Sequence, residues 1–140
     1  MKVLVVSTKK EFEDALHVRR VVFIEEQQVP EDEEIDQYED ECTHVVVYTQ
    51  NQPVAAGRLR NYDGIGKMER ICVIESHRKL GLGKVVMDQL ELLAKEKGFQ
   101  KLKLNAQTHA EAFYEGLGYQ TVSDIFMDAG IPHVTMIKQI

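Results

Sequence analysis

A stretch of fourteen residues, from residue 71 to residue 84, decides how the rest of the chain is interpreted. It reads Ile71-Cys72-Val73-Ile74-Glu75-Ser76-His77-Arg78-Lys79-Leu80-Gly81-Leu82-Gly83-Lys84. An apolar run leads into a polar turn, two glycines and the start of a helical pattern. Glycines let a backbone approach a ligand, and a helix N-terminus presents N–H groups that lack acceptors. With Arg78, Lys79 and Lys84 nearby, the stretch predicts an anion site; a turn that only starts a helix is the alternative.

Upstream of this stretch the pattern predicts one helix and four strands. A β-branched run at 2–6 predicts a buried strand. Thr8 and Glu11 form a capping box that opens a helix over about 9–25. Three further strands follow at 44–49, 53–61 and 67–74. Short turns join them, so these three strands must be antiparallel.

Downstream, a helix buries Leu82, Val86, Leu90 and Leu93 on one face and ends at Gly98. A strand at 101–106 follows, and a second capping box over 108–111 opens a short helix that ends at residue 118. The last strands are expected at 119–123 and 133–138. The order β-α-βββ-α-β-α-ββ predicts an α/β fold with a mixed, mostly antiparallel sheet flanked by helices.

Length and composition narrow the class of protein. The chain has 140 residues and a mass of 16.0 kDa, so residues 1–140 are expected to form one domain. No apolar run approaches the roughly 18 residues of a membrane helix, and we expect no membrane partner. Two cysteines do not build a disulfide scaffold, which favours a reduced, cytoplasmic protein.

The charge of the chain is unevenly spread. Its net value is −6, and residues 31–41 carry 8 carboxylates in 11 positions. Such a field repels a phosphate backbone, so nucleic acid is not an expected partner. The acidic run either attracts an amine-bearing partner or is simply a solvated loop.

Two motifs resemble those of the GCN5-related N-acetyltransferases, the GNAT superfamily. The run Arg78–Gly83 is similar to the family's [QR]-x-x-G-x-[GA] signature, and Ala112–Tyr119 is similar to its second motif. The resemblance covers nearly the whole chain. The segments Arg19–Gln27 and Gly130–His133 further resemble the small bacterial ElaA-type proteins. Short R-x-x-V-F and E-x-D elements also resemble acyl-homoserine lactone synthases.

The resemblance implies a GNAT-like acyl-CoA N-acyltransferase fold with acetyl-CoA as cosubstrate. Backbone groups of Ile71, Cys72 and Val73 would bond the pantetheine arm, and N–H groups of residues 79–84 would hold the pyrophosphate. The remaining implied contacts are side chains. The full implied set is Ile71, Cys72, Val73, Arg78, Lys79, Leu80, Gly81, Leu82, Gly83, Lys84, Asn105, Gln107, Phe113 and Tyr114. Gln107 stands where many family members have Asn, and Asn105 lies two residues earlier.

The implied reaction is direct transfer of an acetyl group to an amine. Tyr114 matches the family's proton donor to the departing thiolate, and Glu69 lies on the strand where some members place a catalytic glutamate. Alternation along that strand would put Glu69 on the same face as Ile71 and Val73. His109 and His133 are alternatives for the base, because histidine titrates near neutral pH.

Candidate acceptor-site residues complete the prediction. They are Glu34, Asp36, His109 and His133. No CxxC or paired-histidine motif is present, so no metal is expected.

We therefore predict an acetyl-CoA-dependent N-acetyltransferase that acts on a primary amine of a small molecule. The alternatives are a non-catalytic acyl-CoA-binding regulatory module and an acyltransferase like the homoserine lactone synthases. A homodimer is a further partner to consider, because the apolar residues 125–127 could serve an interface or only the core.

Overall fold

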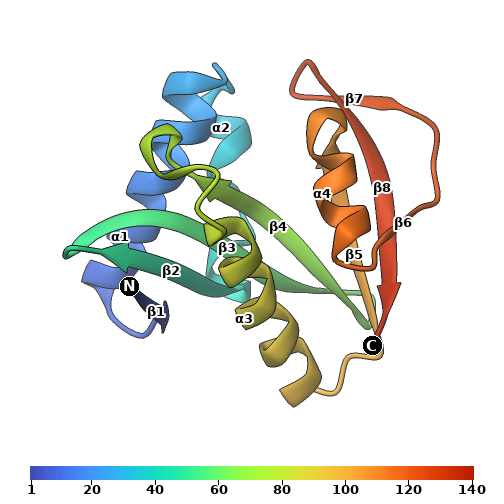
Figure 1. Ribbon diagram of the computed structural model, residues 1–140, viewed down its shortest axis with the longest axis horizontal. Helices are drawn as coiled ribbons and strands as arrows, with labels where there is room; N and C mark the ends of the chain where they lie inside the picture. The colour runs from blue at the N-terminus through green and yellow to red at the C-terminus, as the bar shows by residue number, and fades with distance from the viewer.

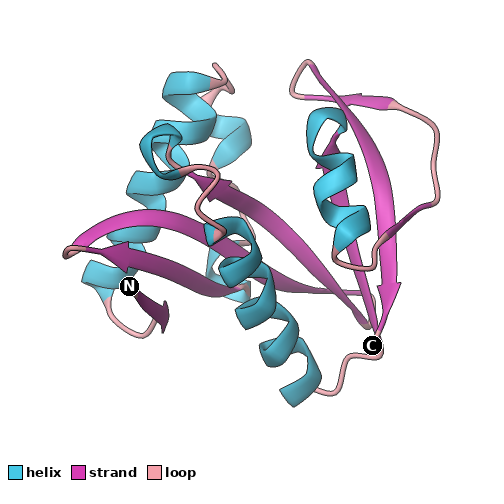
Figure 2. Cartoon of the chain, viewed as in Figure 1, coloured by secondary structure: helices cyan, strands magenta, loops and turns pink.

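The strands form one twisted sheet that opens at its centre. The computed structural model describes residues 1–140, and its sheet has eight strands in the order β1-β2-β3-β4-β5-β8-β6, with β7 beside β8 (Figures 1 and 2). Only the β4–β5 pair is parallel. The strands are β1 (Lys2–Val5), β2 (Thr43–Thr49), β3 (Gln52–Tyr62), β4 (Ile65–Val73), β5 (Lys101–Gln107), β6 (Gln120–Thr121), β7 (Phe126–Asp128) and β8 (Ile131–Gln139).

Helices cover both faces of this sheet. They are α1 (Lys9–Arg19), the π-helical segment η1 (Arg20–Glu26), α2 (Glu31–Glu34), α3 (Leu82–Glu96) and α4 (Glu111–Gly116). The larger apolar cluster lies between the sheet and α3, and it also holds Tyr114 of α4. A smaller cluster lies between the sheet and α1 on the other face. The expected mixed, mostly antiparallel α/β fold is confirmed. No helix is both long and apolar enough to cross a membrane.

The predicted first helix is present, but it changes from an α-helix to a π-helix part-way along. The Thr8 hydroxyl accepts the Glu11 N–H at 3.1 Å, and the Glu11 carboxylate accepts the Ser7 N–H at 2.8 Å. These two bonds satisfy N–H groups at the start of the helix, as a capping box does. From Arg20 onward the helix widens into η1. π-Helical turns are rare, and those that do occur are often found at functional sites. The segment η1 lies beside the pocket described below.

Two expectations near the C-terminus are wrong. The Thr108 side chain does not cap a helix: residues 108–110 form a 3-10 turn before α4. The Glu111 carboxylate accepts from the Thr121 hydroxyl instead, so a tertiary bond replaces the local one. The last stretch also contains β7, a third short strand where the pattern predicted none.

The parallel pair β4–β5 explains the opening in the sheet. Pairing is limited to Gly66–Met68 with Leu102–Leu104. Beyond this point β5 continues against β8 as far as Gln107, while β4 continues against β3 alone. The two strands therefore separate, as Figure 1 shows between the green β4 and the orange β5.

Candidate active site

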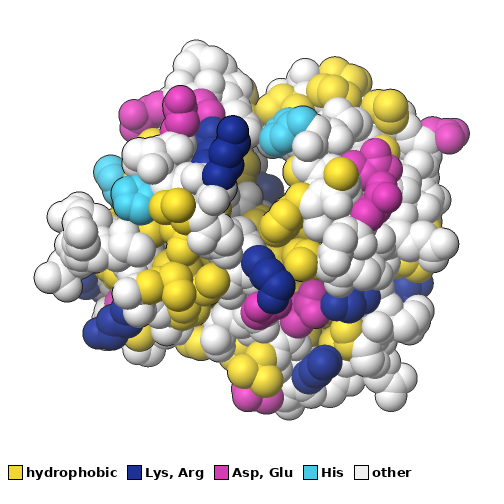
Figure 3. All heavy atoms as spheres, in the orientation of Figure 1, with side chains coloured by type: hydrophobic (Ala, Val, Ile, Leu, Met, Phe, Trp, Pro, Cys, Tyr) yellow, Lys and Arg dark blue, Asp and Glu magenta, His cyan; other side chains and the backbone are white.

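A pocket of about 610 Å³ fills the space where β4 and β5 separate. Its walls come from η1, α2, the outer half of β4, the end of β5, α4 and the β7–β8 turn. Figure 3 shows this face of the molecule hollowed between the part that carries α1 and α2 and the part that carries α4 and β8. From Glu69 to Val73 the β5-facing edge of β4 has no partner strand. Its backbone groups can therefore bond an extended ligand as an added strand would.

A bulge in β4 changes which residues face each side. Arg70 has a φ of 59°, and the register with β3 shifts between the pairs Ala56–Cys72 and Arg58–Glu69. Across the bulge, Ile71 packs on the α3 side together with Met68, whereas Cys72 belongs to the cluster under α1. The expectation that Glu69 shares a face with Ile71 and Val73 is therefore wrong, because an extra residue reverses the alternation.

The glycine-bearing turn lies at one end of the pocket. Gly81 precedes α3 with a left-handed φ of 81°, and the N–H groups of residues 79–84 have no acceptor within the chain. A Cβ on Gly83 would lie 3.2 Å from the Phe113 ring, so glycine keeps this approach open. Unpaired N–H groups at the start of a long helix form a binding surface for an anion.

Two of the three cations of this turn, Arg78 and Lys84, already have partners. The Arg78 guanidinium donates to both oxygens of Glu26, at 2.5 and 2.7 Å, and to the Val73 carbonyl at 2.9 Å. Lys84 pairs with Asp88 at 2.8 Å. An anion that uses the Arg78 charge must therefore compete with Glu26, a residue that the sequence motif did not single out.

Tyr114 lies in the wall of the pocket and has a free hydroxyl. The residue lines the pocket and is 8% exposed, and its hydroxyl has no hydrogen-bond partner in the chain. The ring meets Phe113 edge-on, with centroids 5.0 Å apart. Burial raises the pKa of Tyr114, so the hydroxyl keeps its proton at neutral pH. Burial also raises the pKa of Cys72 to about 12, so this thiol is not an activated nucleophile.

Glu69 is held by three cations. Its carboxylate lies 2.9 Å from Arg58, 3.1 Å from Arg60 and 3.0 Å from Lys67. Burial would raise the pKa of Glu69, but the Arg60 hydrogen bond and the neighbouring charges outweigh it and lower the pKa to about 2. At neutral pH this carboxylate is a weak proton acceptor.

The acidic run is partly turned inward, onto buried arginines. Arg19 and Arg58 are each 1% exposed. Arg19 donates to Glu34 at 2.7 Å and to Glu39 at 2.7 and 2.8 Å, and Arg58 donates to Asp36 at 2.7 and 3.0 Å. We call Arg19, Glu34, Asp36, Glu39, Arg58, Glu69 and Arg70 the carboxylate–arginine cluster. The acidic run is therefore not simply a solvated loop. Nor are all of its carboxylates free to bind an amine, because several already pair with arginines.

The pocket gathers most of the predicted residues. Its lining includes Glu34, Glu69, Ile71, Cys72, Val73, Arg78, Gly83, Asn105, Gln107, His109, Phe113, Tyr114 and His133. The remaining ones lie outside the lining, namely Asp36 in the cluster and Lys79, Leu80, Gly81, Leu82 and Lys84 in the turn. The residues 125–127 do not form core: Ile125 and Met127 are 66% and 63% exposed.

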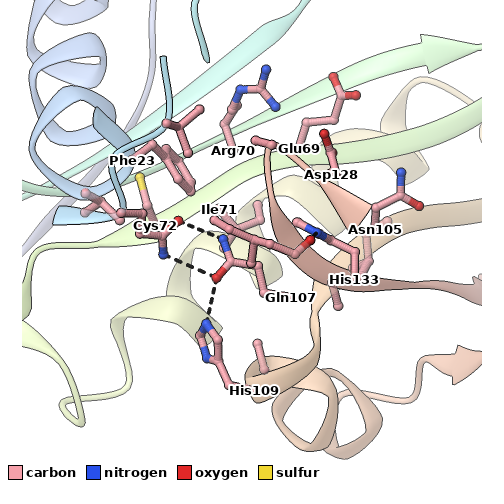
Figure 4. Close-up of a pocket in the computed structure, with 18 of the residues that line it drawn as sticks. Phe23, Glu69, Arg70, Ile71, Cys72, Asn105, Gln107, His109, Asp128 and His133 are labelled. Carbon is pink, nitrogen blue, oxygen red and sulfur yellow. Dashed lines mark hydrogen bonds between the residues drawn. The ribbon is translucent and has the colours of Figure 1, made fainter. Parts of the chain in front are cut away.

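An amide pair that no sequence motif indicates crosses the pocket. The Gln107 amide donates to the Gln27 oxygen at 2.8 Å, joining the end of β5 to the end of η1. His109 Nε2 lies 2.7 Å from the Gln107 oxygen, and Figure 4 shows these bonds as dashed lines. Gln27 and Gln107 are 80 residues apart, so no local motif could predict their pairing.

The chain matches the family model of the acetyltransferase (GNAT) domain over residues 11–140. The chain belongs to the GNAT acetyltransferase family. It is 48% identical over 139 residues to the uncharacterized N-acetyltransferase YjcF of Bacillus subtilis, with 99% of each chain covered. The resemblance to the GNAT superfamily is confirmed, and the acyltransferase expectation is supported by these two matches.

Solved structures agree with this assignment. An acyl-CoA N-acyltransferase from Pseudomonas aeruginosa superposes with a TM-score of 0.89 at 25% identity, covering 99% of both chains. Escherichia coli ElaA shares the fold, with a TM-score of 0.85 at 23% identity and 99% and 97% of the two chains covered. An aminoglycoside 6'-N-acetyltransferase solved with coenzyme A also shares the fold, with a TM-score of 0.79 at 16% identity over 99% and 97%.

Proposed function

We propose that this protein transfers the acetyl group of acetyl-CoA to a primary amine of a small molecule. The observation that carries the proposal is that the unpaired N–H groups of residues 79–84, the open edge of β4 and Tyr114 adjoin one pocket. A pyrophosphate, an extended amide-bearing arm and a thioester fit these three parts in that order.

Different residues would bind different parts of acetyl-CoA. The N–H groups around Gly81 would hold the pyrophosphate, and the edge from Ile71 to Val73 would bond the pantetheine amides. Phe113 and Gly83 would pack against the arm near α4. Asn105 is bonded by the Thr135 hydroxyl at 2.8 Å, which leaves its amide nitrogen available to the pocket.

Tyr114 would supply the proton for the departing thiolate. A thiolate leaves more readily when a proton donor stands beside it, and burial keeps this phenol protonated in the free protein. No group of the chain hydrogen-bonds the hydroxyl of this pocket-lining residue, so it is free to turn toward the sulfur.

The acceptor side of the pocket favours a cation. Carboxylates of Glu33 and Glu34 line it from α2. A protonated amine is attracted by such a field before it loses its proton. We propose Glu34, Asp36, His109 and His133 as the groups that surround the acceptor, with Asp36 acting through the carboxylate–arginine cluster.

Calorimetry with acetyl-CoA tests the proposal first. We expect the wild-type protein to bind it and Gly81→Glu to lose binding, because a carboxylate there opposes an anion and Gly81 adopts a left-handed φ. Thiol release is then followed with alkylamines, polyamines, aminoglycosides and lysine-bearing peptides. Binding without turnover of any amine would favour the regulatory acyl-CoA-binding alternative, and absence of binding would refute the proposed function.

A further inference from the structure

We propose that His133 is the base that takes the proton from the acceptor amine, an assignment that rests on the proposed amine acetylation. Two observations carry it: the proton on its ring is placed by the backbone, and its ring lies across the sheet from Tyr114.

The first observation concerns the tautomer of His133. Nδ1 lies 2.7 Å from the Ile131 carbonyl, which only accepts hydrogen bonds, so Nδ1 must carry the proton of the neutral ring. Nε2 then holds a lone pair. It has no partner in the chain, although the residue is only 8% exposed and lines the pocket. The Phe126 ring lies nearly parallel to the imidazole, at 22°, with the ring centroids 6.0 Å apart.

The second observation concerns the two faces of the sheet. Val134 and Met136 of β8 pack in the cluster that contains Tyr114. Alternation therefore turns His133 to the opposite face, where η1 and α2 lie. His133 stands opposite Gln107 in the β5–β8 register, and Figure 4 shows its ring beside Asn105 in the pocket. Proton acceptor and proton donor thus meet the pocket from opposite sides.

The other candidate bases are less suited to the task. Both oxygens of Glu69 are engaged by cations. His109 is exposed and its Nε2 bonds the Gln107 oxygen. Glu34 accepts from the Arg19 guanidinium at 2.7 Å through one oxygen, and its other oxygen, which has no partner, is buried. Of these side chains, His133 alone combines a tautomer set by the backbone with an unpartnered ring nitrogen in the lining of the pocket.

The proton balance of the transfer follows from these positions. His133 Nε2 takes one proton from the ammonium, and the freed lone pair of the amine forms the C–N bond to the acetyl carbon. The C–S bond breaks, and the sulfur takes the Tyr114 proton. The second amine proton returns to the Tyr114 oxygen, directly or through water. His133 releases its proton to solvent, so one proton is released for each amide formed.

His133→Asn is the variant that isolates this role. The Asn amide nitrogen can replace Nδ1 as donor to the Ile131 carbonyl, while no atom replaces Nε2. Thiol release is measured with the alkylamine that the wild-type protein turns over and with hydroxylamine, which is small and mostly unprotonated at neutral pH. We expect a loss of about 100-fold or more with the alkylamine and less than about tenfold with hydroxylamine. His17→Asn, on the exposed side of α1, is the matched control.

Each outcome decides the assignment. Equal losses with both acceptors would show a merely structural or positioning role, and unchanged rates would show that the base lies elsewhere; both overturn it. An NMR spectrum of the imidazole nitrogens must show the Nδ1–H tautomer for His133, and the Nε2–H tautomer would overturn it without any acceptor. A wild-type protein that binds acetyl-CoA but turns over no amine refutes the proposed function itself.

Discussion

Replacing Arg19 by Met removes the centre of the carboxylate–arginine cluster at nearly constant volume. Glu34, at 2% exposure, would keep only Arg70 at 3.5 Å, and Glu39 would keep Arg58 at 2.9 Å. Removing one partner of a buried ion pair leaves an uncompensated charge and costs roughly 3–5 kcal/mol. For a chain of this size that loss lowers the melting temperature by roughly 10–17 °C.

The pH dependence of this loss has a defined sign. Burial would raise the pKa of Glu39, but the Arg19 hydrogen bond and charge lower it from 4.5 to about 2. A depressed pKa stabilises the folded state above pH 4.5, by at most about 3 kcal/mol here, and this stability is lost as the pH falls toward 2. Without Arg19 the pKa of Glu39 rises, so protonation relieves part of the cost. The difference in free energy of unfolding between Arg19→Met and the wild type should therefore become smaller as the pH falls from 7 to 4.

Urea unfolding at several pH values measures both effects. Arg20→Met is the matched control, because the Arg20–Glu31 pair is 45% and 65% exposed and contributes roughly 0–1 kcal/mol. If Arg19→Met lost no more free energy of unfolding than the control, the carboxylate–arginine cluster would not contribute to stability. If the difference in free energy of unfolding between Arg19→Met and the wild type stayed constant or increased in acid, the loss could not be assigned to unpaired carboxylates.

Two further predictions concern the cofactor side. Glu26→Gln should tighten acetyl-CoA binding by up to about fivefold in calorimetry, because it frees Arg78 from an exposed ion pair of modest strength. Glu25→Gln is the control. Weaker binding in Glu26→Gln would contradict the idea that Glu26 and the bound anion compete for Arg78. Tyr114→Phe should lower kcat by roughly 10²–10⁴-fold, with the acetyl-CoA Kd unchanged, since its hydroxyl bonds nothing in the free protein. A changed Kd with an unchanged kcat would assign Tyr114 to binding.

The cofactor side was predictable because its signals are local. The turn and the start of α3 lie within one stretch of fourteen residues, and Tyr114 lies in a second short motif. Glycine at a left-handed position and apolar residues at helical spacing reflect constraints that act within a few residues. The short strand β7 had no such signal, since three residues are too few to show alternation.

The acceptor side was not predictable in the same way, because its contacts join residues far apart in the sequence. Arg19 meets Glu34 across 15 residues, and Gln27 meets Gln107 across 80. One available signal was Arg58, a charge in the apolar strand Val54–Leu59. A buried charge requires a partner, so this position alone predicts that carboxylates turn inward.

The bulge at Arg70 shows why alternation failed where it mattered most. A left-handed φ is unfavourable for arginine, so the surroundings must hold it. The Arg70 guanidinium donates to the carbonyls of Glu33 and Glu34 and to the Asp36 carboxylate, each at 3.1 Å. The acidic segment that resembles a solvated loop therefore anchors the residue that reverses the faces of β4. Because of that reversal, Glu69 joins the carboxylate–arginine cluster, while Ile71 stays on the cofactor side. Loop and strand thus specify each other, and a rule that treats the strand alone assigns Glu69 to the wrong face.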